Sequence, residues 1–320
     1  MNGLLAVDKP SGPTSHDVVQ SIRRLYGVRR VGHAGTLDPP ATGVLLIGVG
    51  RATRLLNFLQ GLAKGYRARI QFGTTTTTQD AEGEMIQRRQ CEFSRADLVR
   101  ALSEFVGVIE QLPPMFSAIK VAGEPLYKAG RRGEEVERRA RKITIYSNDL
   151  EGFEPDLHRA TVEIRCSSGT YVRTLAYDLG ERLGCGAHLD SLRRLSVGSF
   201  VESGAIPLSR LEEMGREDLG AALLPMAEAM RDFPRVAVEG ERLEAVRHGR
   251  PLPPEIVAVR EGELRMAGVR RTGEVPPHRA GMTAGVPVAV VGPDGELVAV
   301  YRQSRSGLKP AAVLAPAASG

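Results

Sequence analysis

Apolar and polar residues alternate along the first 110 residues in a way that predicts short strands separated by helices. "GLLAVDK" at 3–9 and "GVLLIGVG" at 43–50 are continuous apolar runs of strand length. "YRARIQF" at 66–72 alternates strictly between apolar and polar residues. The even-numbered residues, from Tyr66 to Phe72, therefore share one face. That pattern predicts a strand with one buried face.

Helices are predicted where apolar residues recur every three or four positions behind a capping residue. Thr14 or Ser15 can cap a helix that ends at Gly27, and a shorter helix is expected at 55–61. Ser94 and Asp97 form a capping box ahead of a helix at 94–106. A strand at 160–166 and a helix at 170–184 follow, so the pattern predicts an α+β fold.

The pattern changes beyond residue 230, where short β segments with turns replace the helices. "VPVAVV" and "LVAVYRQ" flank "GPDGE", which predicts a hairpin over 286–303. The stretch at 270–285 is rich in Gly and Pro and is predicted to be a long loop. We therefore expect a first domain at 1–230, a small β-rich domain at 231–312 and a flexible tail at 313–320.

Charge favours an anionic partner, since 43 Lys and Arg against 38 Asp and Glu give a net charge of +5 and a pI near 9.3. The run at 128–142 holds seven basic residues and three Glu. Such a run is typical of a solvated helix face, and phosphate contact is the alternative. Cys91, Cys166 and Cys185 are too few and too scattered for a disulfide framework. "MNGLLAVDKP" resembles neither a signal peptide nor a membrane span, so we expect a cytoplasmic protein that does not contact membranes.

Metal and cofactor sites find little support in the sequence. The six histidines are scattered and form no cluster at ligand spacing, so no metal is expected. "GVGRATR" lacks the lysine of a phosphate-binding loop, and no Gly-x-Ser-x-Gly motif is present. The sequence therefore supports neither a phosphate-binding loop nor a hydrolase triad.

One carboxylate stands out in "GHAGTLDPPATGVL" at 32–45. A simple turn is one interpretation of Asp38, but Pro39 and Pro40 restrict the chain before them and would hold the acid rigidly. Rigid placement suits a nucleophile or a general base. Arg173, in the first turn of the helix at 170–184, is the candidate cation that would keep Asp38 charged, although a surface arginine is the commoner explanation.

Two further residues allow a structural and a functional interpretation. Tyr66 shares its face with apolar residues, so it is either a core residue or a ring that stacks on a ligand. His33 lies five residues before Asp38 and can either contact a base or fix its own loop.

Several motifs together resemble the family of bacterial tRNA pseudouridine(55) synthases, the TruB family. They are "VDKPSGPTSHDVV" at 7–19, "GHAGTLDPPATGVLLIGVGRATR" at 32–54, "GYRA" at 65–68, "CSSGTYVRTLAYDLG" at 166–180 and "GCGAHLDSLRRLSVGSF" at 184–200. The resemblance implies a cofactor-free isomerase that converts one uridine of the tRNA T-loop, at position 55, to its C-glycoside. It also implies a mixed, largely antiparallel central sheet with flanking helices and a C-terminal PUA-like RNA-binding domain.

The resemblance also implies roles for individual residues. Asp38 matches the catalytic aspartate, Arg173 the arginine that pairs with it and Tyr66 the tyrosine that stacks on the base. Leu192 matches a leucine that lines the site, and His33 matches a histidine that holds the opened RNA loop.

Two parts of the match concern the loop that carries Asp38. Lys9 and Pro10 match the first motif, which supports this loop; Lys9 is kept among the candidates for substrate binding, but a structural role is preferred for both. Pro40 stands where the family usually has Leu, which leaves the loop's hydrophobic contact open. Phosphate contacts are expected from the basic run, Arg193, Arg194 and the β-rich domain.

The expected chemistry requires the target base to leave its stack in the RNA, and a carboxylate near the ribose. Residue types leave open whether Asp38 attacks C1′ or takes the 2′ proton. The expected partner is the T-arm of tRNA, bound by a monomer. Alternatives from other classes are a non-catalytic RNA-binding or RNA-chaperone protein, and a related synthase that acts on ribosomal RNA or with a guide RNA.

Overall fold

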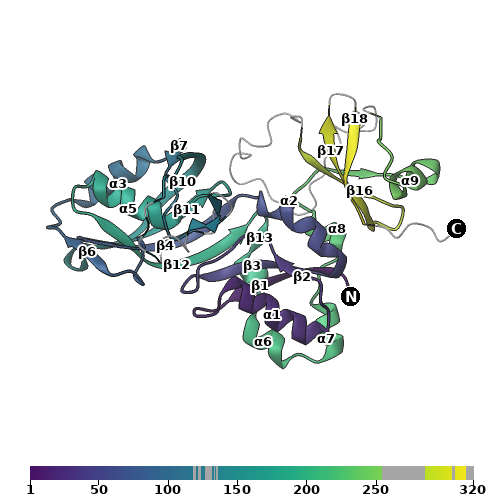
Figure 1. Cartoon of the computed structure of the whole chain (residues 1–320), viewed down its shortest axis with the longest axis horizontal. Helices are drawn as coiled ribbons and strands as arrows, with labels where there is room; N and C mark the ends of the chain where they lie inside the picture. Colours follow the sequence, from purple (N-terminus) through teal and green to yellow (C-terminus); the bar gives the residue numbers. More distant parts are fainter. Residues whose placement is uncertain are drawn as a thin grey trace.

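The computed structural model describes residues 1–117, 120–121, 124–126, 132, 134, 136–253, 285–304 and 307–314. Within these ranges a large mixed sheet runs in the order β14-β1-β3-β12-β4-β11-β10-β7, with β13 added to β12 and β2 to β3. A second sheet runs in the order β15-β16-β17-β18 (Figure 1). Most neighbours in the large sheet are antiparallel, while β1–β14 and β12–β3 are parallel. The predicted α+β class with a largely antiparallel sheet is confirmed.

The strands have the following bounds. They are β1 (Gly3–Lys9), β2 (Val31–His33), β3 (Thr42–Val49), β4 (Lys64–Phe72), β5 (Thr74–Thr76), β6 (Met85–Arg88), β7 (Gly107–Gln111), β8 (Lys120–Val121), β9 (Glu124–Pro125), β10 (Arg141–Glu154), β11 (Arg159–Cys166), β12 (Ala187–Val197), β13 (Phe200–Val201), β14 (Ile206–Pro207), β15 (Arg235–Ala237), β16 (Pro287–Val291), β17 (Leu297–Ser304) and β18 (Gly307–Val313).

The helices have the following bounds. They are α1 (Ser15–Tyr26), α2 (Leu56–Gln60), α3 (Arg95–Glu104), α5 (Val172–Arg182), α6 (Leu208–Glu213), α7 (Arg216–Ala221), α8 (Met226–Ala229) and α9 (Gly240–Arg247), with short 3₁₀ turns η1 (Gly50–Leu55), η2 (Pro155–Leu157) and η3 (Glu202–Gly204).

The predicted caps form at both long helices of the first half of the chain. Thr14 rather than Ser15 caps α1, with Asp17 completing a capping box, and Gly27 ends the helix in the left-handed region at φ 63°. Ser94 and Asp97 form the expected box at α3. These local bonds satisfy backbone N–H groups that would otherwise lack partners at the helix starts.

The periodicity of each strand matches how many of its faces are buried. In β1, odd-numbered residues such as Leu5 pack in the cluster with α1, α3 and α5, while Leu4 packs in a second cluster with η1, α2 and α8. This strand and β3 read as continuous apolar runs because both faces are covered. In β4 the face with Tyr66 is buried, whereas Arg67 and Arg69 are exposed, as the alternation predicted.

The C-terminal sheet packs against the rest of the protein. Leu297 and Leu314 belong to the same buried cluster as Leu4. Arg51 donates to the Leu314 carbonyl at 2.9 Å, and Arg54 donates to that of Val313. The predicted hairpin forms from β16 and β17.

The basic run at 128–142 is not a helix face in its described part, because residues 136–140 lack regular structure and Arg141 and Lys142 begin β10. Pairing of these two residues with β7 gives the segment an extended conformation instead. Residues 270–284 of the predicted loop and 315–320 of the predicted tail lie outside the described residues.

Candidate active site

The Asp38 loop, residues 34–41, connects β2 to β3 and is held by hydrogen bonds from the buried Lys9 on β1. The Lys9 ammonium donates to the carbonyls of Pro10 and Pro39 at 2.9 Å each and to that of Ala41 at 2.7 Å. Lys9 is 0 % exposed, so all three of its N–H groups have protein acceptors and none is available to substrate. The preferred structural role for Lys9 therefore agrees with its contacts. Pro40 is exposed.

Arg173 approaches the Asp38 carboxylate from α5. Its Nε lies 3.1 Å from Oδ2 of Asp38, and its side chain is 7 % exposed against 43 % for Asp38. Nη1 donates to the Thr78 carbonyl at 3.1 Å, and Nη2 donates to the Phe116 carbonyl at 3.0 Å. The guanidinium is thus fixed by backbone groups from two other segments while one edge faces Asp38.

Asp80 is a second carboxylate at this site that the sequence did not single out. Its Oδ2 accepts from Nη1 of Arg173 at 3.2 Å, and its side chain is 10 % exposed. Its Oδ1 accepts from the Thr78 hydroxyl and from the Glu82 backbone N–H at 3.1 Å. The only available signal was an acid at the end of "TTTTTQD", which is ordinary turn composition, so its partner became visible only in three dimensions.

Opposing effects act on the charge of Asp38. Burial raises the pKa of its carboxyl above the usual value, and the charge of Asp80 raises it further, whereas Arg173 and Lys9 lower it. Burial is the largest of these effects. Arg173 is therefore the main group that keeps Asp38 ionised.

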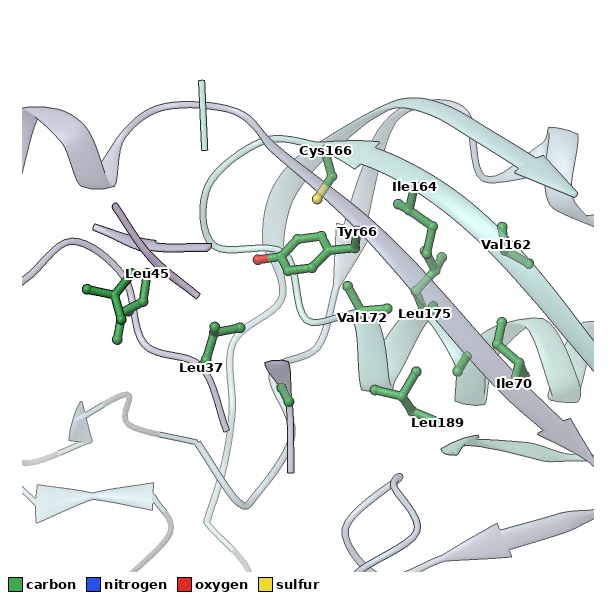
Figure 2. Packing of buried hydrophobic residues seen from close by; sticks show 14 of the residues in the cluster. Leu37, Leu45, Tyr66, Ile70, Val162, Ile164, Cys166, Val172, Leu175 and Leu189 are labelled. Carbon is green, nitrogen blue, oxygen red and sulfur yellow. The ribbon is translucent and has the colours of Figure 1, made fainter. Parts of the chain in front are cut away.

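Tyr66 lies deeper than a ring that stacks freely on a base would. It is 7 % exposed and belongs to the main buried cluster. Figure 2 shows its ring among Leu37, Val172 and Cys166, with the hydroxyl oxygen directed toward the side of Leu37. Burial raises the pKa of Tyr66, while contact with Arg194 opposes that shift. Stacking on a base would require neighbouring side chains to move.

Leu192 and His33 flank this region. Leu192, on β12, is half-buried against the main cluster and pairs in register with Ala68. His33 ends β2, immediately before the Asp38 loop, and its buried Nδ1 has no hydrogen-bond partner. Burial lowers the pKa of His33, which favours the neutral ring. An unpartnered buried nitrogen is costly unless a ligand or a water satisfies it.

The expected phosphate contact of Arg194 does not fit the structure, whereas that of Arg193, whose side chain is 34 % exposed, stays a prediction. Arg194 is 1 % exposed and donates to backbone carbonyls, so the prediction is wrong for this residue. Arg193 is bound by Asp8 at 2.9 Å and by Glu202 at 2.7 Å. Adjacent strand residues point to opposite faces, and the pattern could not show which face was covered.

Across the described ranges, no group of three or more His, Cys, Asp or Glu side chains could hold a metal ion. Over the same ranges, no helix combines the length and the apolar character needed to cross a bilayer.

Comparison with known proteins gives two adjoining family matches. Residues 23–172 match the TruB family pseudouridylate synthase N-terminal domain, and residues 173–231 match the tRNA pseudouridylate synthase B C-terminal domain. The chain belongs to the TruB family of pseudouridylate synthases. Membership in this family identifies it as an enzyme and confirms the resemblance seen in the motifs.

Curated relatives agree with this assignment to the TruB family. The tRNA pseudouridine synthase B of Syntrophotalea carbinolica is 47 % identical over 81 % of this chain and 84 % of its own length. That of Aliivibrio fischeri is 41 % identical over 83 % of this chain and 86 % of its own length.

A crystal structure of a Cbf5-Nop10-Gar1 complex contains a chain with a TM-score of 0.71 and 25 % identity, covering 98 % of this chain and 85 % of that one. A structure of an H/ACA RNP bound to a substrate RNA contains another, with a TM-score of 0.69, 23 % identity and coverage of 99 % and 86 %. These neighbours confirm the fold of a pseudouridine synthase.

Proposed function

We propose that this enzyme converts uridine 55 in the T-loop of tRNA to pseudouridine, with Asp38 as its catalytic carboxylate. The observation that carries the proposal is the Asp38–Arg173 contact of 3.1 Å, in which a rigid, half-exposed acid faces a buried guanidinium. Relatives with the name tRNA pseudouridine synthase B favour tRNA as the substrate, and favour an enzyme over a non-catalytic RNA-binding protein.

The reaction breaks the bond from N1 of uracil to C1′ of the ribose, turns the base and joins C5 to C1′. C5 then loses its proton and N1 gains one, so product and substrate have the same atoms. Breaking the first bond builds positive charge on the ribose, which a carboxylate can stabilise or trap. Asp38 can do this by attack on C1′, or it can take the 2′ proton; both routes need it ionised. Arg173 acts as the group that holds the carboxylate charged and oriented.

The proposed substrate contacts come from residues around Asp38. Leu192 and Tyr66 would face the flipped base, and the base would replace the contacts that cover Tyr66 in this structure. His33, with its free Nδ1, would contact the RNA loop. The C-terminal sheet, which we propose is PUA-like, would extend the RNA contact surface, and the enzyme would act as a monomer in the cytoplasm, where tRNA is modified.

An isomerisation assay tests this proposal directly. A transcript of the T-arm hairpin is incubated with wild type or Asp38→Asn, without metal or guide RNA, and pseudouridine is quantified after nuclease digestion. We expect product at the single T-loop position with wild type and none with Asp38→Asn. No product from wild type, or equal product from the variant, would refute the proposal.

Two comparisons define the substrate. A ribosomal RNA transcript incubated under the same conditions should remain unmodified; efficient modification would instead support the related synthase. Asp190→Asn is a matched control, because it removes the same charge from the ion pair that Asp190 on β12 forms with Arg69 on β4. Its product yield should equal that of wild type. Light scattering tests the proposed monomeric state, for which we expect a mass near 34.5 kDa.

A further inference from the structure

Arg194 heads the large side chains that are fully buried in the described part of the protein, and it is only 1 % exposed. It lies on β12 between β3 and β4, paired in register with Gly43 and Tyr66. The close approach requires glycine, because a Cβ at Gly43 would lie 2.2 Å from the Arg194 carbonyl oxygen. A long charged side chain is thus enclosed between two strands of the core.

The guanidinium of Arg194 joins both ends of the segment that carries Asp38. Its Nε donates to the Val44 carbonyl at 2.6 Å, beyond the C-terminal end of the loop. Nη2 donates to the Gly35 carbonyl at 3.2 Å, and Nη1 contacts that of Thr36 at 3.4 Å, before Asp38. The planar fork of arginine holds its N–H donors apart in fixed directions, so this one side chain reaches carbonyls on both sides of Asp38.

The same group also interacts with Tyr66. The contact with Arg194 lowers the pKa of the Tyr66 hydroxyl, against the larger effect of burial. A single guanidinium therefore binds the loop of the acid, while its residue lies beside Tyr66 on the neighbouring strand. Asp38 lies in the loop before β3 and Tyr66 lies on β4, and β12 separates these two strands in the sheet.

Neither of the usual roles for an arginine accounts for this arrangement. Burial keeps Arg194 away from RNA phosphates, and among the described residues no carboxylate lies in ion-pair range of it. Burying a cation without a counter-ion costs free energy. We therefore look for the role of Arg194 in its hydrogen bonds, which hold the Asp38 loop in place.

We propose that Arg194 is a positioning residue of the reaction, which sets the Asp38 loop relative to Tyr66. This inference rests on the proposed function, because it assigns Arg194 to the same site. Displacement of a reacting group by about 1 Å can cost about 100-fold in rate, so a looser loop would slow the chemical step without loosening the bound RNA.

The test separates the chemical step from binding. Arg194→Lys keeps the charge but loses the fork, while Arg67→Met is the control, since Arg67 lies next to Tyr66 on the exposed face, paired with Glu151 at 2.7 Å. For each protein we measure the T-arm Kd, the single-turnover rate constant at saturating RNA, and cooperative melting. We expect Arg194→Lys to lower the rate constant about 100-fold with a Kd within about threefold of wild type, and Arg67→Met to change neither.

Other outcomes would overturn the positioning role of Arg194, and they can be told apart from a failure of the proposed function. An unchanged rate constant in folded Arg194→Lys excludes the positioning role, and a loss confined to Kd with a shallower salt dependence would restore the phosphate contact. If Arg194→Lys does not fold, Arg194→Gln supplies the same comparison, since its amide donates to one carbonyl without a charge. Failure of both to fold would show that Arg194 holds the core rather than the loop. Absence of product from wild type would instead refute the proposed function.

Discussion

Asp80→Asn should weaken the folded protein, because an amide cannot satisfy both sides of the Asp80 site. In the wild type one carboxylate oxygen accepts from Arg173 and the other from the Glu82 N–H and the Thr78 hydroxyl. Whichever way the Asn amide is turned, its NH₂ group faces either the guanidinium of Arg173 or the N–H of Glu82. Two donors then meet in a site that is only 10 % exposed.

The loss of folding free energy in Asp80→Asn depends on which partners Arg173 keeps. Removing one partner of a buried ion pair costs about 3–5 kcal/mol, and a hydrogen bond to a charged group contributes about 1.5–3 kcal/mol. In Asp80→Asn, Arg173 keeps its contacts with Asp38 and two carbonyls, so it is not left unpaired. We therefore expect the cost of one hydrogen bond to a charged group, about 2–3 kcal/mol. With an unfolding entropy of about 2.1 cal/mol/K for each of the 320 residues, that corresponds to a fall in Tm of about 3–5 °C.

Urea and thermal unfolding of wild type, Asp80→Asn and Asp190→Asn measure this effect. Asp190 pairs with Arg69 at the surface, so its substitution should cost less than about 1 kcal/mol. We also expect Asp80→Asn to lower the single-turnover rate of pseudouridine formation, because Arg173 loses one of the groups that orient it. Equal stability of the two variants would refute the argument that Asp80 anchors Arg173.

Two further predictions concern the acid and the tyrosine. Arg173 lowers the pKa of Asp38, so Arg173→Met should raise that pKa; since the reaction needs the ionised carboxylate, the acid limb of the pH–rate profile should move to higher pH. An unmoved limb, or one at lower pH, would show that another group controls the profile. Tyr66→Ala should lower the free energy of unfolding by about 3–5 kcal/mol, since the ring is in the core, whereas Tyr66→Phe keeps the ring and should cost only about 0.5–1.5 kcal/mol for the lost hydroxyl. Urea unfolding checks both variants. A Tyr66→Ala variant as stable as wild type would show that the ring does not contribute to the packing of the core.

Local chemistry made much of the fold predictable from the sequence. The capping boxes at Thr14 and Ser94 and the left-handed Gly27 depend on residues within one turn of each other, so their outcome does not depend on the rest of the chain. Alternation in β4 and the continuous apolar runs of β1 and β3 predicted how many faces of each strand are covered. The motifs likewise identified Asp38 and Arg173 as a pair, through resemblance to a family.

Partners distant along the chain were decided only by the tertiary structure. Asp80 and Arg173 are 93 positions apart, and neither composition nor spacing could bring them into contact. Arg193 and Arg194 are identical in type and adjacent, yet one is bound by surface acids and the other is enclosed in the core. The pairing of β12 with both β3 and β4 decides which of them faces inward, and that pairing belongs to the sheet as a whole. Sequence patterns therefore determined the elements and singled out the acid that we propose as catalytic, while packing determined the charges that hold it.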